Sequence, residues 1–166
     1  MIYKCLYIVC PTDHLESAIN KRFEGEKYFY TLLGNALVID KTAVAQIASL
    51  IHSQGIKEVI LVLSEDNAIL LDAVNTQKFI EVKGLKGAYE YILKEKKHAD
   101  KSWETFDENA MFFSYYLNRS IQDLEMGLKK LKVNQTKIKG KLYSKAYDGF
   151  RDIYPQLLYF NPIHLN

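Results

Sequence analysis

The sequence contains little cysteine, little net charge and no long apolar run, and each shortage excludes a class of protein. Its 166 residues include two cysteines and carry a formal net charge of +2. Cys5 and Cys10 lie an odd number of residues apart on one expected strand, so their side chains point to opposite faces and we expect no disulfide between them. The small charge gives no support for a nucleic-acid partner or an anionic membrane surface. No apolar segment approaches the roughly 20 residues that cross a bilayer.

Targeting signals and repeats are also missing from the sequence. The chain passes from Met1 to Lys4 straight into an apolar strand, without the basic and apolar regions of a signal peptide, so we expect a cytoplasmic protein. No internal repeat, low-complexity tract or linker interrupts it. The length suits one domain, and 48% hydrophobic residues are enough for a sizeable core. We therefore expect a single α/β domain over residues 1–166.

The stretch from residue 28 to residue 67 organises the predicted fold. It indicates a strand over Tyr28–Leu33, a turn at Gly34 and Asn35, a helix over Thr42–Ser53 that ends at Gly55, and an apolar strand over Val59–Leu63. A continuously apolar strand needs cover on both faces, and a helix directly before it supplies that cover in a parallel sheet. We predict a mostly parallel, Rossmann-like sheet of four to five strands with helices on both faces.

Hydrophobic spacing and end signals predict the other elements. Asp13 and Glu16 resemble a capping box at the start of a helix that runs to about Phe23, and Ser64 or Asp66 is the expected cap of a short helix over residues 69–74. A strand is expected over Lys4–Val9 and an irregular segment over Phe79–Gly87, followed by a helix from about Tyr89 into the charged Lys94–Lys101 stretch. Two helical pieces are expected over Glu104–Leu131, with a second start at Ser120.

Two strands are expected to end the chain. The first is an edge strand over Thr136–Tyr147 that Lys137, Lys139 and Lys141 keep soluble, and the second is a short strand over Leu157–Phe160.

One predicted helix is apolar on every side. Large apolar groups follow one another from Met111 to Leu117. A helix of this kind needs cover all round, which in a small domain indicates either a partner subunit or a deep central position. On the first of these alternatives we predict a homodimer.

The order of these signals resembles that of the β-class carbonic anhydrases over most of the chain. In that family a first strand ends in Cys-x-Asp-Ser-Arg, a second ends in Ala-Gly-Asn, and a third, after a helix, ends in Gly-His-x-x-Cys-Gly. The matching segments here are residues 10–14, 33–35 and 63–68. No single motif is intact, so the resemblance depends on order and spacing. It implies the same α/β scaffold.

The departures from the family pattern fall on its chemistry. The family holds a catalytic zinc through the first Cys, the His and the second Cys, and those positions here are Cys10, Ser64 and Asn67. A catalytic zinc needs about three protein ligands, and one cysteine does not hold it. The family's Asp-Arg pair falls on Thr12 and His14, or involves Asp13 if the alignment shifts by one. The resemblance therefore implies the scaffold without zinc and argues against the activity.

The candidate site is the crevice at the carboxyl ends of the first and third strands, where open α/β sheets bind ligands. Its expected lining is Cys10, Thr12, Asp13, His14, Gly34, Asn35, Ser64 and Asn67. Five of them have an ordinary structural explanation too: Cys10 as a buried thiol, His14 as a polar residue of a first helical turn, Gly34 and Asn35 as a turn, and Ser64 as a cap. Acidic residues after Ser64 disfavour an anion at the next helix start.

We interpret the chain as a carbonic-anhydrase-like protein without zinc or hydratase activity, acting as a dimeric binding or structural module. One alternative is an enzyme that acts on a small polar substrate in the crevice, with Cys10 or His14 as the reactive group. Another is a carbonic anhydrase whose zinc site has moved to Cys10 and His14 with a distant histidine: His52, His98 or His164. A nucleic-acid binder that uses the lysine face is the weakest reading, because the net charge is near zero.

Overall fold

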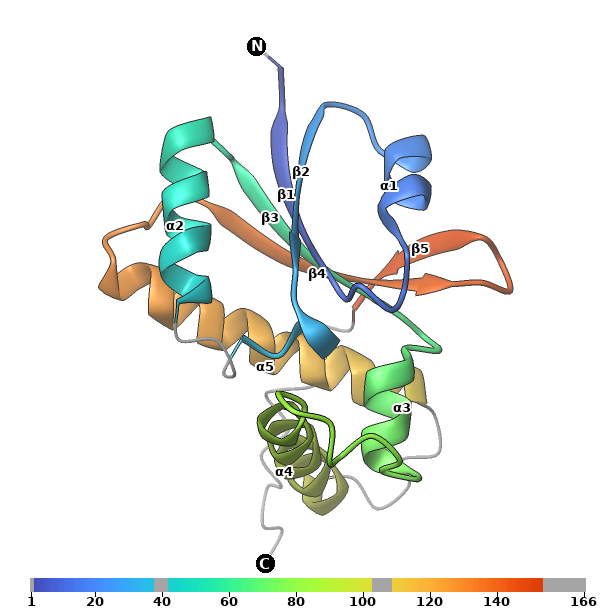
Figure 1. Cartoon of the computed structure of the whole chain (residues 1–166). Helices are drawn as coiled ribbons and strands as arrows, with labels where there is room; N and C mark the ends of the chain where they lie inside the picture. The colour runs from blue at the N-terminus through green and yellow to red at the C-terminus, as the bar shows by residue number, and fades with distance from the viewer. Residues whose placement is uncertain (1, 38–41, 103–108, 154–166) are drawn as a thin grey trace, which may run out of the picture.

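The computed structural model describes residues 2–37, 42–102 and 109–153, and strands and helices alternate in the first part of the chain (Figure 1). The elements are β1 (Lys4–Val9), α1 (Glu16–Arg22), β2 (Glu26–Thr31), the 3-10 turn η1 (Leu33–Asn35), α2 (Ala43–Gln54), β3 (Glu58–Ser64), α3 (Ala68–Val74), α4 (Lys86–Ser102), α5 (Asn109–Lys130), β4 (Lys137–Ser144) and β5 (Gly149–Asp152). The predicted strand over Leu157–Phe160 and the residues Trp103 and His164 lie outside the described residues.

The strands form one five-stranded sheet in the order β2-β1-β3-β4-β5. β1 pairs in parallel with β2 and β3, β3 pairs in parallel with β4, and β5 is antiparallel to β4. The predicted α/β class and mostly parallel sheet are therefore confirmed. Every residue of β3 is buried, as expected for a parallel strand covered on both faces.

The two faces of the sheet carry separate cores, because successive side chains of a strand point to opposite sides. Leu6, Ile8 and Cys10 pack with α2, α5 and the segments around α3 and α4. Cys5 lies in the other core, with Leu15 and Ile19 from the α1 side. Figure 1 shows α1 and α2 on opposite sides of the sheet. Both cysteines are buried and free, so the prediction of no disulfide is confirmed.

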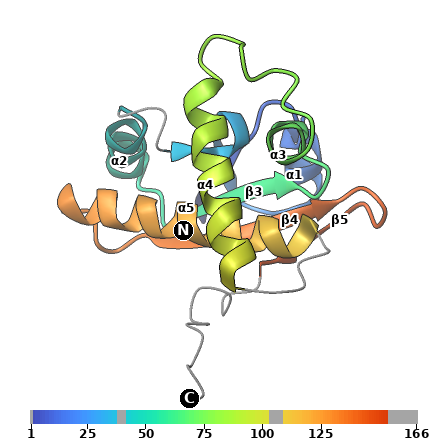
Figure 2. The ribbon, with the colours of Figure 1, turned by 90° about the horizontal axis from the view of Figure 1, so that it is seen from below.

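The helix that is apolar all round lies within the fold of one chain. α5 is a single helix, so the predicted break at Ser120 is wrong. It packs on β4 and β3 and against α2 and α4, and Figure 2 shows α4 crossing it on the side away from the sheet. Phe112, Phe113, Tyr116 and Leu117 are thereby buried without a partner subunit. The deep central position explains the pattern, and the argument for a dimer from this helix no longer holds.

Three other sequence predictions need correction. α1 begins at Glu16 after Leu15 and has no side-chain cap, so Asp13 and Glu16 form no capping box. α3 is capped by Asn67, whose side chain accepts a hydrogen bond from the Leu70 N–H, and the first turn of this helix has no acidic residue. The cap is therefore neither Ser64, which ends β3, nor Asp66.

β4 is not an edge strand. β5 pairs with its second half, from Lys141 to Ser144, after a turn in which Asp148 has a φ of 43°. Asp-Gly is a common sequence signal for a hairpin turn, and Asp148 followed by Gly149 is the signal that identifies this hairpin. Lys139 and Lys141 lie on the α1 face of the sheet, where they pair with Glu58 and Asp152 respectively. No described helix is both long and apolar enough to cross a membrane.

A buried hydrogen bond joins α5 to the carboxyl edge of the sheet. The Tyr116 hydroxyl donates to the Gly34 carbonyl at 2.7 Å, and both residues are buried. Burial raises the pKa of Tyr116 well above its usual value, so the hydroxyl stays protonated and donates. The bond positions η1 under the ends of β1 and β3.

We expect Tyr116→Phe to lower the free energy of unfolding by about 1–2 kcal/mol, because the ring is kept and the buried Gly34 carbonyl loses its donor. Urea unfolding followed by circular dichroism measures the change. Tyr147→Phe is the matched control, since Tyr147 is 86% exposed. Equal stability of wild type and Tyr116→Phe would show that this bond does not anchor η1.

Candidate functional site

The crevice lies where the strand order reverses. β1 has β2 on one side and β3 on the other, so the connection from β1 leads to β2 in one direction along the sheet and the connection from β3 leads to β4 in the other. Ligands of open α/β sheets bind beside the carboxyl ends of strands at such a point. The segment after β1, the turn η1 and the segment after β3 meet here.

Asn35 joins the ends of the two central strands. Its side-chain Nδ2 donates to the Val62 carbonyl at 2.9 Å and to the Ile8 carbonyl at 3.4 Å. The side chain is fully buried, and its Oδ1 has no hydrogen-bond partner among the described residues. Gly34 and Asn35 both have positive φ, 57° and 51°, which explains why glycine and asparagine occupy this turn.

The Cys10 thiol is held in the wall of the crevice. The Gly34 N–H donates to its Sγ at 3.2 Å, and the Thr12 hydroxyl lies 3.0 Å from the same sulfur. Cys10 has no solvent exposure, and it packs in the core on the α2 face of the sheet. A buried thiol with these partners behaves as a small apolar side chain.

Asp13 links the turn after β1 to the end of β3. Its Oδ2 accepts from the Ser64 N–H and its Oδ1 from the Asn67 Nδ2, both at 2.8 Å. A backbone hydrogen bond from Asp13 N to Cys10 O forms the turn that points this carboxyl at β3. Burial raises the pKa of the Asp13 carboxyl to about 6, although the two N–H donors favour its ionised form.

Ion pairs from the β4–β5 hairpin cover the next residues. Lys145 pairs with Asp66 at 2.6 Å, and Arg151 pairs with Glu65 at 2.5 Å. The Ser64 hydroxyl also bonds to the Asp66 carboxylate. The acidic residues after β3 thus face cations from the hairpin, and they lie before α3. The prediction that they occupy the first turn of a helix is wrong.

Comparison with known proteins finds matches to this chain among solved structures and in neither of the other two comparisons. No protein-family model and no curated protein matches the sequence. Solved β-carbonic anhydrases do match in structure. CafA of Aspergillus fumigatus superimposes with a TM-score of 0.72 and 11% identity over 93% of this chain and 77% of that chain. The Coccomyxa enzyme in complex with acetazolamide gives 0.71 and 10% over 92% and 72%. Wild-type CafD of A. fumigatus gives 0.65 and 18% over 92% and 90%.

The chain has the β-carbonic anhydrase fold. The sequence resemblance is confirmed at this level, since identities below 20% carry the fold and nothing about the reaction. The three places where the resemblance puts the zinc ligands of the family are Cys10, Ser64 and Asn67. Asp13, Gly34 and Asn35 bring them to one crevice through the bonds described above.

These residues do not fit a zinc ion. The Asn67 amide is engaged at both ends, since its Oδ1 accepts from Leu70 N and its Nδ2 donates to Asp13. The Ser64 hydroxyl is bonded to Asp66. Neither an amide nor a serine hydroxyl is an ordinary zinc ligand, which leaves the Cys10 sulfur alone. In the described part of the chain, no group of three or more His, Cys, Asp or Glu side chains is placed to hold a metal ion.

Six of the eight predicted residues form one hydrogen-bonded set, which consists of Cys10, Thr12, Asp13, Gly34, Ser64 and Asn67. Asn35 lies beside them and bonds to the carbonyls of Ile8 and Val62. His14 is not part of this arrangement, because it is exposed, has a φ of 52° and bonds to none of the other seven. Its predicted place in a first helical turn is wrong, since α1 starts two residues later. Sequence analysis missed Tyr116, Lys145 and Arg151, which reach the crevice from segments 50 or more residues away and carry no local signal.

The Asp13 carboxyl makes a testable contribution to the pH dependence of stability. Its folded pKa of about 6 lies above the unfolded value of about 3.9, so the native state holds this proton more tightly and stability falls as pH rises from about 4 to 6. We expect the free energy of unfolding of wild type minus that of Asp13→Ala to be about 2 kcal/mol larger at pH 4 than at pH 7.

Urea unfolding of both proteins at the two pH values measures this difference. Glu24→Ala is the control, because Glu24 is exposed and its variant should track wild type at both pH values. A wild-type advantage that grows between pH 4 and pH 7 would mean that the ionised carboxylate is the better partner for Ser64 and Asn67.

Proposed function

We propose that this chain is a carbonic-anhydrase-like protein without zinc or CO2 hydratase activity, which acts as a binding or structural module. The observation that carries the proposal is the state of the three positions that would hold zinc. Ser64 and Asn67 are bonded to Asp13, Asp66 and α3, and Cys10 is buried beside Gly34 and Thr12. The crevice is therefore closed by the protein's own hydrogen bonds.

The alternative of an enzyme that uses Cys10 or His14 receives less support. A nucleophilic cysteine needs access to substrate and a nearby base. Cys10 is fully buried, and its sulfur contacts an amide and a hydroxyl. His14 bonds to no crevice residue. A relocated zinc site at Cys10 and His14 meets the same difficulty, because the two side chains do not join a third ligand among the described residues.

We expect purified wild-type protein to contain well under one zinc per chain and to show no CO2 hydration above buffer. Elemental analysis and stopped-flow hydration on the same untagged sample measure both. One zinc per chain together with hydration would falsify the proposal.

A gain-of-ligand variant sharpens the test. Ser64→His with Asn67→Cys would restore a Cys, His, Cys set around Cys10, so we expect this double variant to take up about one zinc per chain. The same variant with Cys10→Ser is the matched control and should lose the metal. Circular dichroism confirms that each variant is folded. If the double variant is folded and binds no zinc, the three positions do not converge as the fold requires.

We also propose that the chain self-associates in the cytoplasm. Support comes from two β-carbonic anhydrases of Sordaria macrospora, described as tetrameric, which match with a TM-score of 0.63 and 14% identity over 92% of this chain and 81% of that chain. We expect sedimentation velocity at micromolar concentration to show a species of at least two chains. A single monomer peak up to 100 μM, about the top of the range for a specific oligomer, would exclude it.

A further inference from the structure

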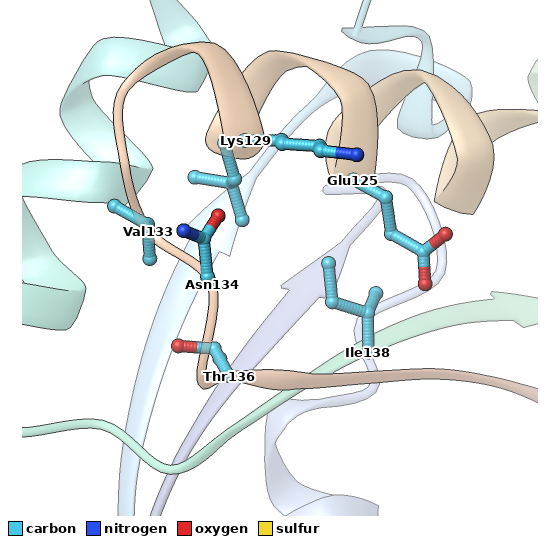
Figure 3. A pocket seen from close by; sticks show the side chains of 7 residues that line it. Glu125, Lys129, Val133, Asn134, Thr136 and Ile138 are labelled. Carbon is cyan, nitrogen blue, oxygen red and sulfur yellow. The ribbon is translucent and has the colours of Figure 1, made fainter.

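Two neighbouring pockets lie at the amino edge of the sheet, at the opposite end from the crevice. One has a volume of about 320 Å³ and lies between the end of α5 and the start of β4 (Figure 3). The other has a volume of about 380 Å³ and extends to the end of α2 and the start of β3. Val133, Asn134 and Thr136 line both pockets, so the α5–β4 loop is a wall that the two pockets share, and we call the two together the recess.

Cations dominate the polar lining of this recess. Lys57, Lys129 and Lys132 line it, and Glu125 is its single acidic side chain. None of the three lysines forms an ion pair with another residue in the described part of the chain. In Figure 3, Lys129 and Glu125 extend from the same side of α5 along the pocket rim. The recess therefore has an excess of uncompensated positive charge.

The ends of α2 and α5 lie beside the recess, and hydrogen bonds reduce the partial negative charge that they bring to it. Helix carboxyl ends are partly negative where their carbonyls have no donor. The Ile51 carbonyl accepts from the N–H groups of Gly55 and Ile56, and the Leu128 carbonyl accepts from those of Leu131 and Val133. These bonds satisfy the carbonyls nearest the pocket floor.

The loop wall supplies neutral donors beside the lysines. The backbone N–H groups of Asn134, Gln135 and Thr136 donate to no other described residue, and their side chains also have no partner there. Three successive free amides are a common feature of anion-binding loops. Val133, Leu128 and Ile138 form an apolar floor under them.

We propose that the pocket on the α2 side of this recess binds a small organic phosphate, with the phosphate at Lys57, Lys132 and the loop amides and an apolar body over Val133 and Ile56. Two lysines and three free N–H groups offer more donors than the two oxygens of a carboxylate accept, which favours a phosphate. The volume of this pocket, about 380 Å³, suits a small molecule. This site is independent of the crevice and of the function proposed for it.

The test is a titration of the 15N-labelled full chain with phenyl phosphate, followed by amide chemical shifts. We expect saturable shifts at residues 55–57 and 132–136, and none of that size with phenol, which lacks the phosphate. The variant Lys57→Gln with Lys132→Gln should weaken binding by about tenfold or more, as expected for the loss of two charged hydrogen bonds. Lys83→Gln with Lys97→Gln removes the same charge from exposed positions elsewhere and should bind like wild type.

Several outcomes would overturn the proposal. Phenol shifts equal to those of phenyl phosphate would remove the role of the anion. Equal losses in both double variants would reduce the effect to net charge. An absence of saturable shifts up to about 10 mM phenyl phosphate, near the weakest affinity that a specific pocket shows, would exclude the site. Tight binding of a single-stranded oligonucleotide at the same amides, with weak phenyl phosphate binding, would assign the lysines to a nucleic acid instead.

Discussion

The Asp13 carboxylate is the contact on which the carboxyl edge of this protein depends. It joins the turn after β1 to Ser64 and Asn67 at the end of β3, and Asn67 in turn caps α3. Burying a carboxylate costs free energy, which is why the pKa of Asp13 is raised to about 6. Two N–H donors offset part of that cost. Where the resemblance places the zinc of the family, an acidic side chain joins the ends of the two strands in this protein.

This replacement changes what the crevice offers to a ligand. The donors and acceptors that face it are already paired, apart from the Asn35 Oδ1, and the next acidic residues are covered by Lys145 and Arg151. At the amino edge the situation is reversed, since three lysines and three loop amides have no partner among the described residues. The polar groups at the carboxyl edge of the sheet are therefore mostly hydrogen-bonded, whereas donors at the amino edge are free to bind an anion.

The sequence predicted the features that depend on local pattern. The apolar runs of β1 and β3 and the stop of α2 at Gly55, with a φ of 66°, follow from period and turn chemistry, and the structure confirms them. The caps of α1 and α3 were wrong because each depends on a residue whose side chain is bonded elsewhere. Asp13 resembles a cap in sequence, but it accepts from a segment 51 residues away. The all-apolar part of α5 predicted burial correctly, and only the fold could decide that α4 and the sheet provide the cover.

Cys10 shows that a residue which matches a family motif can have a purely structural role. The family resemblance puts it at the first zinc-ligand position, so on that reading it is the one part of a zinc site still present. In the structure its burial and its contact with the Gly34 N–H explain its presence without any metal. A thiol at a strand end fills core volume as a small apolar group does. Binding a zinc ion would need Cys10 and the residues at positions 64 and 67 together. Ser64 and Asn67 instead form the hydrogen bonds with Asp66, Asp13 and Leu70 that close the crevice.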